Sequence, residues 1–451
     1  MRQKIHFTSL GCSRNLVDTE VMLGIVSKVG YEIVDDPSEA DFLVINTCGF
    51  LEEARQEAFN VIENLFSCKK DCAEIIVAGC MVALHKKDLI SKFPNIHYFL
   101  GSGDVDKIVE AILSKNRGEC IGEAKSYLQM GEVPRIVTTP KHYAYLKIAE
   151  GCKKRCSFCV IPLIKGKLRS KPLNQVIKEA TTLINSGVKE IILIAQDLGD
   201  YGKDLGEKNG LVTLLKEILK IDGDYWIRLL YLYPDEITED IIDLIGKEER
   251  ICSYLDMPIQ HINDELLSAM NRKTSKKQIE ERISSLRNNV PGVVIRTSLM
   301  VGFPGESEDQ FEELLEFVKN VKLDNIGIFK YSKEEQSHSA TLIGHIDDSI
   351  KDDRLNRVAI LQKKIVESIN QKYIGKRLKV LIDGFHRESD KLLIGRFYGQ
   401  CAEIDGEIII NDWRSVKKFG EFYDVEITGV FEYDLIGKVV RFKKRSLNIV
   451  Y

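Results

Sequence analysis

At residues 151–159 the chain reads Gly-Cys-Lys-Lys-Arg-Cys-Ser-Phe-Cys, after a predicted strand at Tyr143–Ala149. The three thiols are Cys152, Cys156 and Cys159. Three closely spaced thiolates can bind three irons of a [4Fe–4S] cubane and leave the fourth iron open to a small molecule. A structural zinc ion needs four ligands, and neither a fourth cysteine nor a histidine lies nearby in the sequence. The spacing therefore favours an iron–sulfur cluster with an open iron over zinc.

Strands and helices alternate after this point. The predicted strands are Tyr143–Ala149, Glu190–Ala195, Trp226–Tyr231, Tyr254–Pro258, Val293–Val301 and Asn325–Tyr331. The predicted helices between them include Leu173–Asn185, Glu265–Asn288 and Glu308–Val321. Successive βα units predict a full or partial parallel barrel, whose chemistry lies at the carboxyl ends of the strands. The cysteine stretch follows the first strand, as this rule requires.

Polar residues and a glycine in or after later strands are candidate contacts for a nucleoside cosubstrate. Gln196 follows the second strand, Arg296 lies in the fifth, and Gly302 begins the turn after it. Strand-end location is a weak indicator of function. An ion pair for Arg296 with a nearby carboxylate is an equally good interpretation.

The N-terminal third predicts a separate parallel sheet. Ile5–Ser9, Phe42–Asn46 and Ile75–Ala78 are short apolar runs separated by charged helical stretches. This alternation is typical of an open α/β domain.

Each of these runs ends near a cysteine next to a glycine, namely Cys12, Cys48 and Cys80. Because sites in open α/β sheets form at the carboxyl ends of the strands, the three thiols should converge on one crevice and bind a second cluster. The pair Cys68 and Cys72 would share one side of a helix, but neither residue ends a strand.

The C-terminal part predicts a helix at Asp352–Ile374 and then a small antiparallel β-barrel of oligonucleotide-binding (OB-like) size. Its middle is acidic, with Glu403, Asp405 and Glu407 close together, whereas a nucleic-acid-binding face should be basic. A basic tail follows at residues 441–445.

The totals fit a cytoplasmic protein. A length of 451 residues predicts about two to four domains. The net charge of −4 gives no general attraction to nucleic acid. Eleven cysteines indicate metal binding in a reducing compartment. No basic and apolar leader follows Met1, and no apolar run reaches membrane-spanning length, so we expect no membrane contact.

The chain resembles the methylthiotransferases, a radical S-adenosylmethionine family, over nearly its whole length. Residues 9–15 read Ser-Leu-Gly-Cys-Ser-Arg-Asn, and residues 46–50 read Asn-Thr-Cys-Gly-Phe. Residues 256–264 read Asp-Met-Pro-Ile-Gln-His-Ile-Asn-Asp, and residues 403–406 read Glu-Ile-Asp-Gly. These motifs are similar to the RimO branch, whereas the transfer-RNA branch typically has Gln-Met after the first cysteine.

The resemblance implies an N-terminal methylthiotransferase domain at 1–125, a radical core at 138–368 and a TRAM barrel at 371–440. It implies that Cys152, Cys156 and Cys159 bind the radical-generating [4Fe–4S] cluster. It also implies that Cys12, Cys48 and Cys80 bind an auxiliary one. Gln196, Arg296 and Gly302 remain predictions from strand-end location.

The implied reaction places sulfur and a methyl group on an aspartate β-carbon of the twelfth small-subunit ribosomal protein. No acid or base removes hydrogen from such a carbon near neutral pH, so a cofactor-derived radical is needed. S-adenosylmethionine would supply both the radical and the methyl group, with an external electron donor and a sulfur source. We expect the acidic barrel to dock the basic ribosomal protein.

Three alternatives stay open from the sequence. A transfer-RNA adenosine could be the target of the same chemistry. A two-cluster electron carrier would normally have four cysteines for each cluster. A zinc-stabilised RNA-binding module would contain zinc in place of iron and sulfide.

Overall fold

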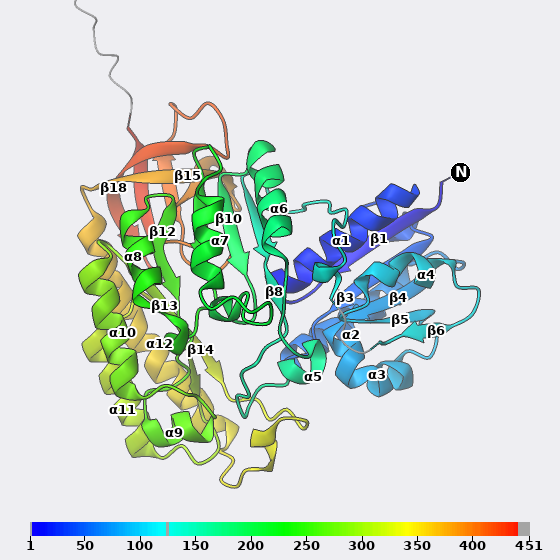
Figure 1. The fold of residues 1–451 in the computed structure, drawn as a ribbon, viewed down its shortest axis with the longest axis horizontal. Helices are drawn as coiled ribbons and strands as arrows, with labels where there is room; N and C mark the ends of the chain where they lie inside the picture. The colour runs from blue at the N-terminus through cyan, green and yellow to red at the C-terminus, as the bar shows by residue number, and fades with distance from the viewer. Residues whose placement is uncertain (1, 123–125, 441–451) are drawn as a thin grey trace, which may run out of the picture.

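The computed structural model describes residues 2–122 and 126–440, so the basic tail lies outside the described residues. Figure 1 shows an N-terminal sheet in blue and cyan beside a central sheet in green, with a small barrel in orange and red at one end. No described helix has both the length and the apolar character needed to cross a bilayer.

The N-terminal sheet is open and entirely parallel, with strand order β2-β1-β3-β4-β5-β6. Its strands are β1 Lys4–Ser9, β2 Glu32–Ile33, β3 Phe42–Thr47, β4 Glu74–Gly79, β5 Tyr98–Gly101 and β6 Gly118–Cys120. Apolar residues of α1 Ser13–Val29 and α4 Ile108–Leu113 pack on one face. Those of α2 Glu52–Cys68 and α3 Cys80–Lys92 pack on the other. The predicted open α/β sheet is confirmed.

The central sheet contains six parallel strands in the order β14-β13-β12-β11-β10-β7. The strands are β7 Tyr143–Lys147, β10 Glu190–Ile194, β11 Trp226–Leu229, β12 Ile251–Asp256, β13 Val294–Val301 and β14 Asn325–Lys330. The helices on its outer side include α6 Leu173–Asn185, α7 Gly210–Ile218, α8 Glu239–Lys247, α10 Lys276–Asn289 and α11 Glu308–Val321. We call this unit the half-barrel, because β7 and β14 do not pair. The predicted partial (βα)6 barrel is confirmed.

One predicted helix is divided. The structure has α9 Asp264–Ala269 and α10 in place of a single helix at Glu265–Asn288. Asn271 adopts a positive φ of 55°, which no helix accommodates, and Ser275 begins α10 with a capping box. The break carries Arg272 toward the mouth of the half-barrel.

The inner face of the half-barrel is filled by the rest of the chain. Tyr145, Trp226 and Tyr254 of the half-barrel pack in one cluster with Val17 of α1 and Leu381 of the C-terminal barrel. The N-terminal unit and the barrel therefore both bury apolar surface against the same sheet.

The C-terminal barrel is closed, with order β15-β16-β17-β19-β18. It follows α12 Asp348–Asn370 and consists of β15 Arg377–His386, β16 Ser389–Phe397, β17 Ile408–Asp412, β18 Phe422–Phe431 and β19 Asp434–Val439. All neighbouring strands are antiparallel except β17 and β19, which are parallel. The expectation of a small antiparallel barrel therefore holds apart from this one pair.

Candidate functional site

Three strands of the N-terminal sheet end together. Ser9 of β1 lies opposite Asn46 of β3, and Thr47 of β3 lies opposite Gly79 of β4. Because the strands are parallel and in register, the loops that follow them leave the sheet at one edge. These loops carry Cys12, Cys48 and Cys80, which we call the N-terminal triad.

Asn15 connects the three loops of the N-terminal triad. Its Nδ2 donates hydrogen bonds to the carbonyls of Leu10 at 3.1 Å and Thr47 at 3.0 Å. Its Oδ1 accepts from the Cys80 thiol, with a Sγ–Oδ1 distance of 3.7 Å. Gly11 has φ +89°, and a Cβ there would lie 2.5 Å from the Cys48 Cβ. The N-terminal triad therefore requires both an amide side chain and a glycine among its neighbours.

The second set of thiols, Cys152, Cys156 and Cys159, occupies the loop between β8 Ala149–Glu150 and α5 Ile161–Lys165. We call it the loop triad. The backbone N–H of Lys154 donates to the Cys152 Sγ at 3.3 Å. The Cys159 N–H donates to the Cys156 carbonyl at 3.1 Å. These bonds curl the loop so that its thiols face one region.

Two further residues at the loop triad were not predicted from the sequence. Arg272 Nη1 donates to the Cys156 Sγ at 3.6 Å, and its guanidinium lies 4.1 Å from the centroid of the Tyr233 ring. The Tyr233 hydroxyl lies 4.0 Å from the same sulfur. A cation at this position offsets the negative charge of bound thiolates. No sequence motif indicates either residue, because the helix break and the strand end bring them together only in three dimensions.

The two triads lie on adjoining segments. Cys80 packs in one apolar cluster with Val160, the residue after Cys159, and with Ile164. Arg14, two residues after Cys12, donates from Nη1 to the Ala195 carbonyl at the end of β10, at 2.8 Å. The N-terminal sheet is thus attached to the mouth of the half-barrel by both apolar and polar contacts.

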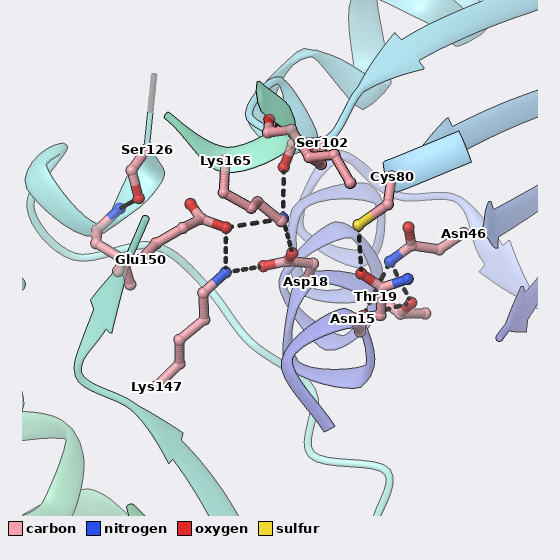
Figure 2. A network of polar contacts seen from close by, with 12 residues as sticks. Asn15, Asp18, Thr19, Asn46, Cys80, Ser102, Ser126, Lys147, Glu150 and Lys165 are labelled. Carbon is pink, nitrogen blue, oxygen red and sulfur yellow. Dashed lines mark hydrogen bonds and ion pairs between the residues drawn. The ribbon is translucent and has the colours of Figure 1, made fainter. Parts of the chain in front are cut away.

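A buried network of four charges supports this junction (Figure 2). Lys147 Nζ lies 2.6 Å from an Asp18 oxygen and 2.8 Å from a Glu150 oxygen. Lys165 Nζ lies 3.1 Å from the other Asp18 oxygen and 2.8 Å from Glu150. Two cations and two anions balance, and Lys165 also donates to the Ser102 carbonyl at 3.2 Å. Breaking such a buried set is costly because the remaining charge loses its partner.

The protein environment makes most of the thiols weak acids in the absence of metal. Burial raises the pKa of Cys80, Cys152 and Cys159 to about 12. Burial also opposes ionisation of Cys12, but the Arg14 guanidinium and nearby backbone N–H groups lower its pKa below the usual value. Metal ligation deprotonates a thiol outright, so these sites release protons when they load.

The arrangement of the sulfurs bears on whether a triad could hold a single zinc ion. Three thiolates on one zinc, at about 2.3 Å each, would all lie within about 4.6 Å of one another. Among the described residues, only Asp197, Asp200 and Glu236 bring three ligand atoms within 4.8 Å of one another. Lys154 already pairs with Glu236 at 2.7 Å and with Asp197 at 3.5 Å in that group. Neither cysteine triad brings its three sulfurs within 4.8 Å of one another in the described residues, so neither is arranged for one zinc ion.

Gln196 lies directly after Ala195 at the end of β10, near the loop triad. Its Oε1 is buried and has no hydrogen-bond partner among the described residues. A buried amide oxygen without a donor is costly unless a ligand supplies one. Gln196 therefore has an unpaired acceptor, and its contact with a cosubstrate stays a prediction.

Arg296 and Gly302 have other partners. Arg296 is the third residue of β13, far from its carboxyl end, and its guanidinium pairs with Asp256 at 2.9 Å and with Asp405 of the barrel at 3.6 Å. Gly302 has φ +77°, and a Cβ there would collide with the Lys351 side chain. Arg296 thus follows the ion-pair interpretation, and the glycine is required by its backbone and by Lys351.

The acidic loop of the barrel faces the half-barrel, and the carboxylates of Glu403 and Asp405 contact its tyrosines. The Glu403 carboxylate accepts from the hydroxyls of Tyr143 at 2.9 Å and Tyr145 at 3.1 Å. The Asp405 side chain is only 2% exposed and accepts from the Tyr254 hydroxyl at 2.8 Å. Asp405 is therefore withdrawn from solvent, whereas Glu403 remains exposed although it is hydrogen-bonded, and docking of a partner by this loop stays a prediction.

Three family descriptions match parts of the chain. Residues 4–101 match the Uncharacterized protein family UPF0004, residues 146–318 the Radical SAM superfamily, and residues 374–440 the TRAM domain. Among solved structures, the radical S-adenosylmethionine methyltransferase TsrM from Kitasatospora setae has a TM-score of 0.56 at 16% identity. That similarity covers 74% of this chain and 76% of TsrM, and it supports the fold alone.

Curated relatives match almost from end to end. A protein of Protochlamydia amoebophila is 56% identical over 97% of this chain and 92% of its own length. A protein of Chlamydia felis is 55% identical over 98% and 96%, and one of Clostridioides difficile is 42% identical over 97% and 99%. Each is named ribosomal protein uS12 methylthiotransferase RimO. The chain belongs to this RimO family of radical S-adenosylmethionine enzymes.

Proposed function

We propose that this protein inserts sulfur and a methyl group at the β-carbon of an aspartate in ribosomal protein uS12, using S-adenosylmethionine. The observation that carries the proposal is the pair of three-cysteine sets on adjoining segments, joined through Cys80, Val160 and Arg14. Membership of the RimO family supports the choice of substrate.

The two triads have separate roles in this proposal. Cys152, Cys156 and Cys159 hold the radical-generating [4Fe–4S] cluster, and Cys12, Cys48 and Cys80 hold an auxiliary [4Fe–4S] cluster that presents sulfur. Bound clusters supply the electron that cleaves S-adenosylmethionine and the sulfur that the substrate carbon accepts. The divisions 1–125, 138–368 and 371–440 correspond to the auxiliary-cluster domain, the radical core and the TRAM domain.

The chain's own residues contact the cluster ligands, bind S-adenosylmethionine and hold the two triads together. Arg272 and Tyr233 contact Cys156 from the mouth of the half-barrel. Gln196 offers its free acceptor to S-adenosylmethionine. The buried network around Lys165 keeps the N-terminal triad against the loop triad. Holding reactants in one geometry is the main rate contribution that such residues can make.

The substrate is a basic ribosomal protein, which implies a cytoplasmic location, an external electron donor and a sulfur source. In this proposal, exposed acidic side chains of the barrel, such as Asp424 and Glu432, bind the basic ribosomal protein. Exposed charges change association rates and salt dependence more than affinity. Reversing both charges should slow uS12 capture and leave cleavage of S-adenosylmethionine without uS12 unchanged.

The decisive experiment uses the full chain, purified and reconstituted without oxygen. It is incubated with S-adenosylmethionine and a reductant, together with purified uS12 or with bulk transfer RNA. We expect a methylthio mass increment on a uS12 aspartate and none on the RNA. An increment on adenosine alone would reverse the choice of substrate, and no increment on either would contradict the proposal.

A further inference from the structure

Arg14 occupies the junction between the two triads. It lies in the first turn of α1, and its Nη1 donates to the Ala195 carbonyl of the half-barrel at 2.8 Å. The centre of its guanidinium lies 4.7 Å from the centroid of the Tyr231 ring. The Arg14 guanidinium lies near Cys12 and Cys80 of one triad and near Cys159 of the other, and its charge lowers the pKa of Cys12. The side chain therefore lies beside thiols of both triads.

The Arg14 cation has no carboxylate partner among the described residues. Three other buried arginines do: Arg228 pairs with Glu190, Arg354 with Glu306, and Arg396 with Glu190. Asp256, at the end of β12, is not free to pair with Arg14. Its carboxylate already pairs with Arg296 at 2.9 Å and accepts from the Tyr231 N–H at 3.2 Å. The Cys12 thiol is the acidic group beside this cation, and a largely desolvated guanidinium with no carboxylate partner favours a further anion from outside the chain.

The contacts that Arg14 does make hold it in one orientation. Tyr231 has a positive φ of 63°, a strained backbone geometry for a tyrosine. Two hydrogen bonds maintain this geometry, because the Tyr231 N–H donates to Asp256 and its carbonyl accepts from Leu198 N–H at 2.9 Å. The ring thus presents one face to the guanidinium. Of the five guanidinium N–H donors, the carbonyl of Ala195 uses one and the Cys12 thiol lies within reach of another, which still leaves enough for two parallel bonds to a carboxylate.

We infer that Arg14, supported by Tyr231 and the Ala195 carbonyl, is the binding site for the side-chain carboxylate of the target aspartate. The inference rests on the proposed function. In aspartate the β-carbon is bonded directly to the carboxylate carbon. A clamp on the carboxylate therefore fixes the reacting carbon within one bond, at the junction of the two triads. Arg14 is then a binding and specificity residue that selects aspartate over a neutral side chain.

The test measures binding of uS12 to the reconstituted enzyme with S-adenosylmethionine and without reductant. Two forms of uS12 are compared: the natural protein, and a variant with asparagine at the aspartate that mass spectrometry identifies as modified. We expect the wild-type enzyme to bind the aspartate form at least about 10-fold more tightly, because truncating a buried charge pair costs more than one decade in affinity. Arg14→Met should bring the ratio close to one, and Arg14→Lys should keep part of the preference.

Arg55→Met is the matched control. Arg55 also joins the N-terminal unit to the half-barrel side, since its Nη1 lies 2.5 Å from Glu334, but it contacts neither triad. Losing it should weaken binding of both uS12 forms equally and leave their ratio unchanged. Iron and sulfide content is measured for every variant. If Arg14→Met fails to load iron, the comparison is made with Arg14→Lys, which keeps the charge beside the thiols and should show a reduced ratio.

The outcomes distinguish failure of the role inferred for Arg14 from failure of the proposed function. An enzyme that methylthiolates uS12 but binds its aspartate and asparagine forms equally would overturn the role of Arg14 and leave the proposed function intact. The same holds if Arg14→Met keeps the wild-type ratio, because the cation would then serve only to balance the charge of the clusters. An enzyme that does not modify uS12 at all would contradict the proposed function itself.

Discussion

Single neighbouring residues shape the surroundings of each cysteine triad. Asn15 bonds to all three loops of the N-terminal triad, and the small Gly11 leaves room beside Cys48. The loop triad is shaped by backbone bonds within residues 152–159 and by Arg272 from another segment. The triads are therefore independent in their immediate contacts although they adjoin.

This independence predicts the metal content of two triple variants. Replacing Cys12, Cys48 and Cys80 by alanine should lower the iron of the reconstituted protein from roughly eight atoms to about four, and so should replacing the loop triad, because each cubane holds four irons. Iron and acid-labile sulfide are measured on protein kept without oxygen. Cys68 and Cys72 are exposed, and their double alanine variant should keep all the iron. Loss of both clusters in either triple variant would contradict two separate sites.

Arg272 should control the reduction potential of the loop-triad cluster. A cation near a thiolate stabilises the reduced cluster, which carries one more negative charge, so Arg272→Met should lower the potential. The expected shift is on the order of 100 mV, the Coulomb energy of unit charges about 7 Å apart at an effective dielectric constant of ~20. A redox titration followed by EPR measures it. Arg250, whose bonds go to carbonyls on the outer side, provides a control that should not shift.

At the scale of elements, α5 joins the two triads. It begins two residues after Cys159 and ends at Lys165, whose ammonium lies among Asp18, Glu150 and the Ser102 carbonyl. The strands β7 and β8 contribute Lys147 and Glu150 to the same network (Figure 2). A short helix is thus held at its end by charges from the N-terminal unit and from the half-barrel.

Removing the Lys165 charge should destabilise this junction strongly. Lys165→Met leaves two buried carboxylates with only Lys147, and we expect a loss of about 3–5 kcal/mol in the free energy of unfolding. Urea denaturation followed by circular dichroism measures it. Lys247, 71% exposed and paired with Asp243, is the control, and Lys247→Met should cost about 0.5 kcal/mol or less. Similar losses in both variants would show that the network adds little.

At the scale of the whole molecule, a second ionic chain joins the barrel to the half-barrel. Arg396 of β16 pairs with Glu190 of β10 at 2.5 Å and with Asp383 of β15 at 2.9 Å, and Asp383 also accepts from His142 at 2.7 Å. Burial opposes ionisation of Glu190 and Asp383, but the adjacent arginines lower the pKa of both below the usual values. The barrel is therefore held in place by anions that must stay charged.

These depressed pKa values predict loss of stability in acid. A carboxylate whose pKa is lower in the folded state stabilises the fold above its unfolded pKa, about 4.3 for glutamate, and loses this contribution as the pH falls through the folded value. Melting temperatures between about pH 3 and 7 are compared for wild type and Glu190→Gln. The variant should be less stable by about 3–5 kcal/mol at neutral pH, because Arg228 and Arg396 lose a buried partner. The difference should shrink below about pH 4, and a constant difference would contradict the assignment.

Local patterns in the sequence were sufficient to predict most of the helices and strands named in the sequence analysis. The helices at Leu173–Asn185 and Glu308–Val321 agree with prediction residue for residue. Apolar periodicity and the Ser307 cap define such segments without help from the rest of the chain. The break at Asn271 was missed, because a residue with a positive φ inside a helical pattern depends on distant contacts.

The sequence by itself determined the two sets of cysteines, the order of the three folded units and the family, since spacing and periodicity are local properties of the chain. Only the tertiary structure decided the neighbours of those cysteines. Arg14 approaches Ala195, Arg272 approaches Cys156, and Arg296 is withdrawn into ion pairs with Asp256 and Asp405. The reason is physical: a charge takes its partner from whichever segment packing brings near, and no local pattern encodes that choice.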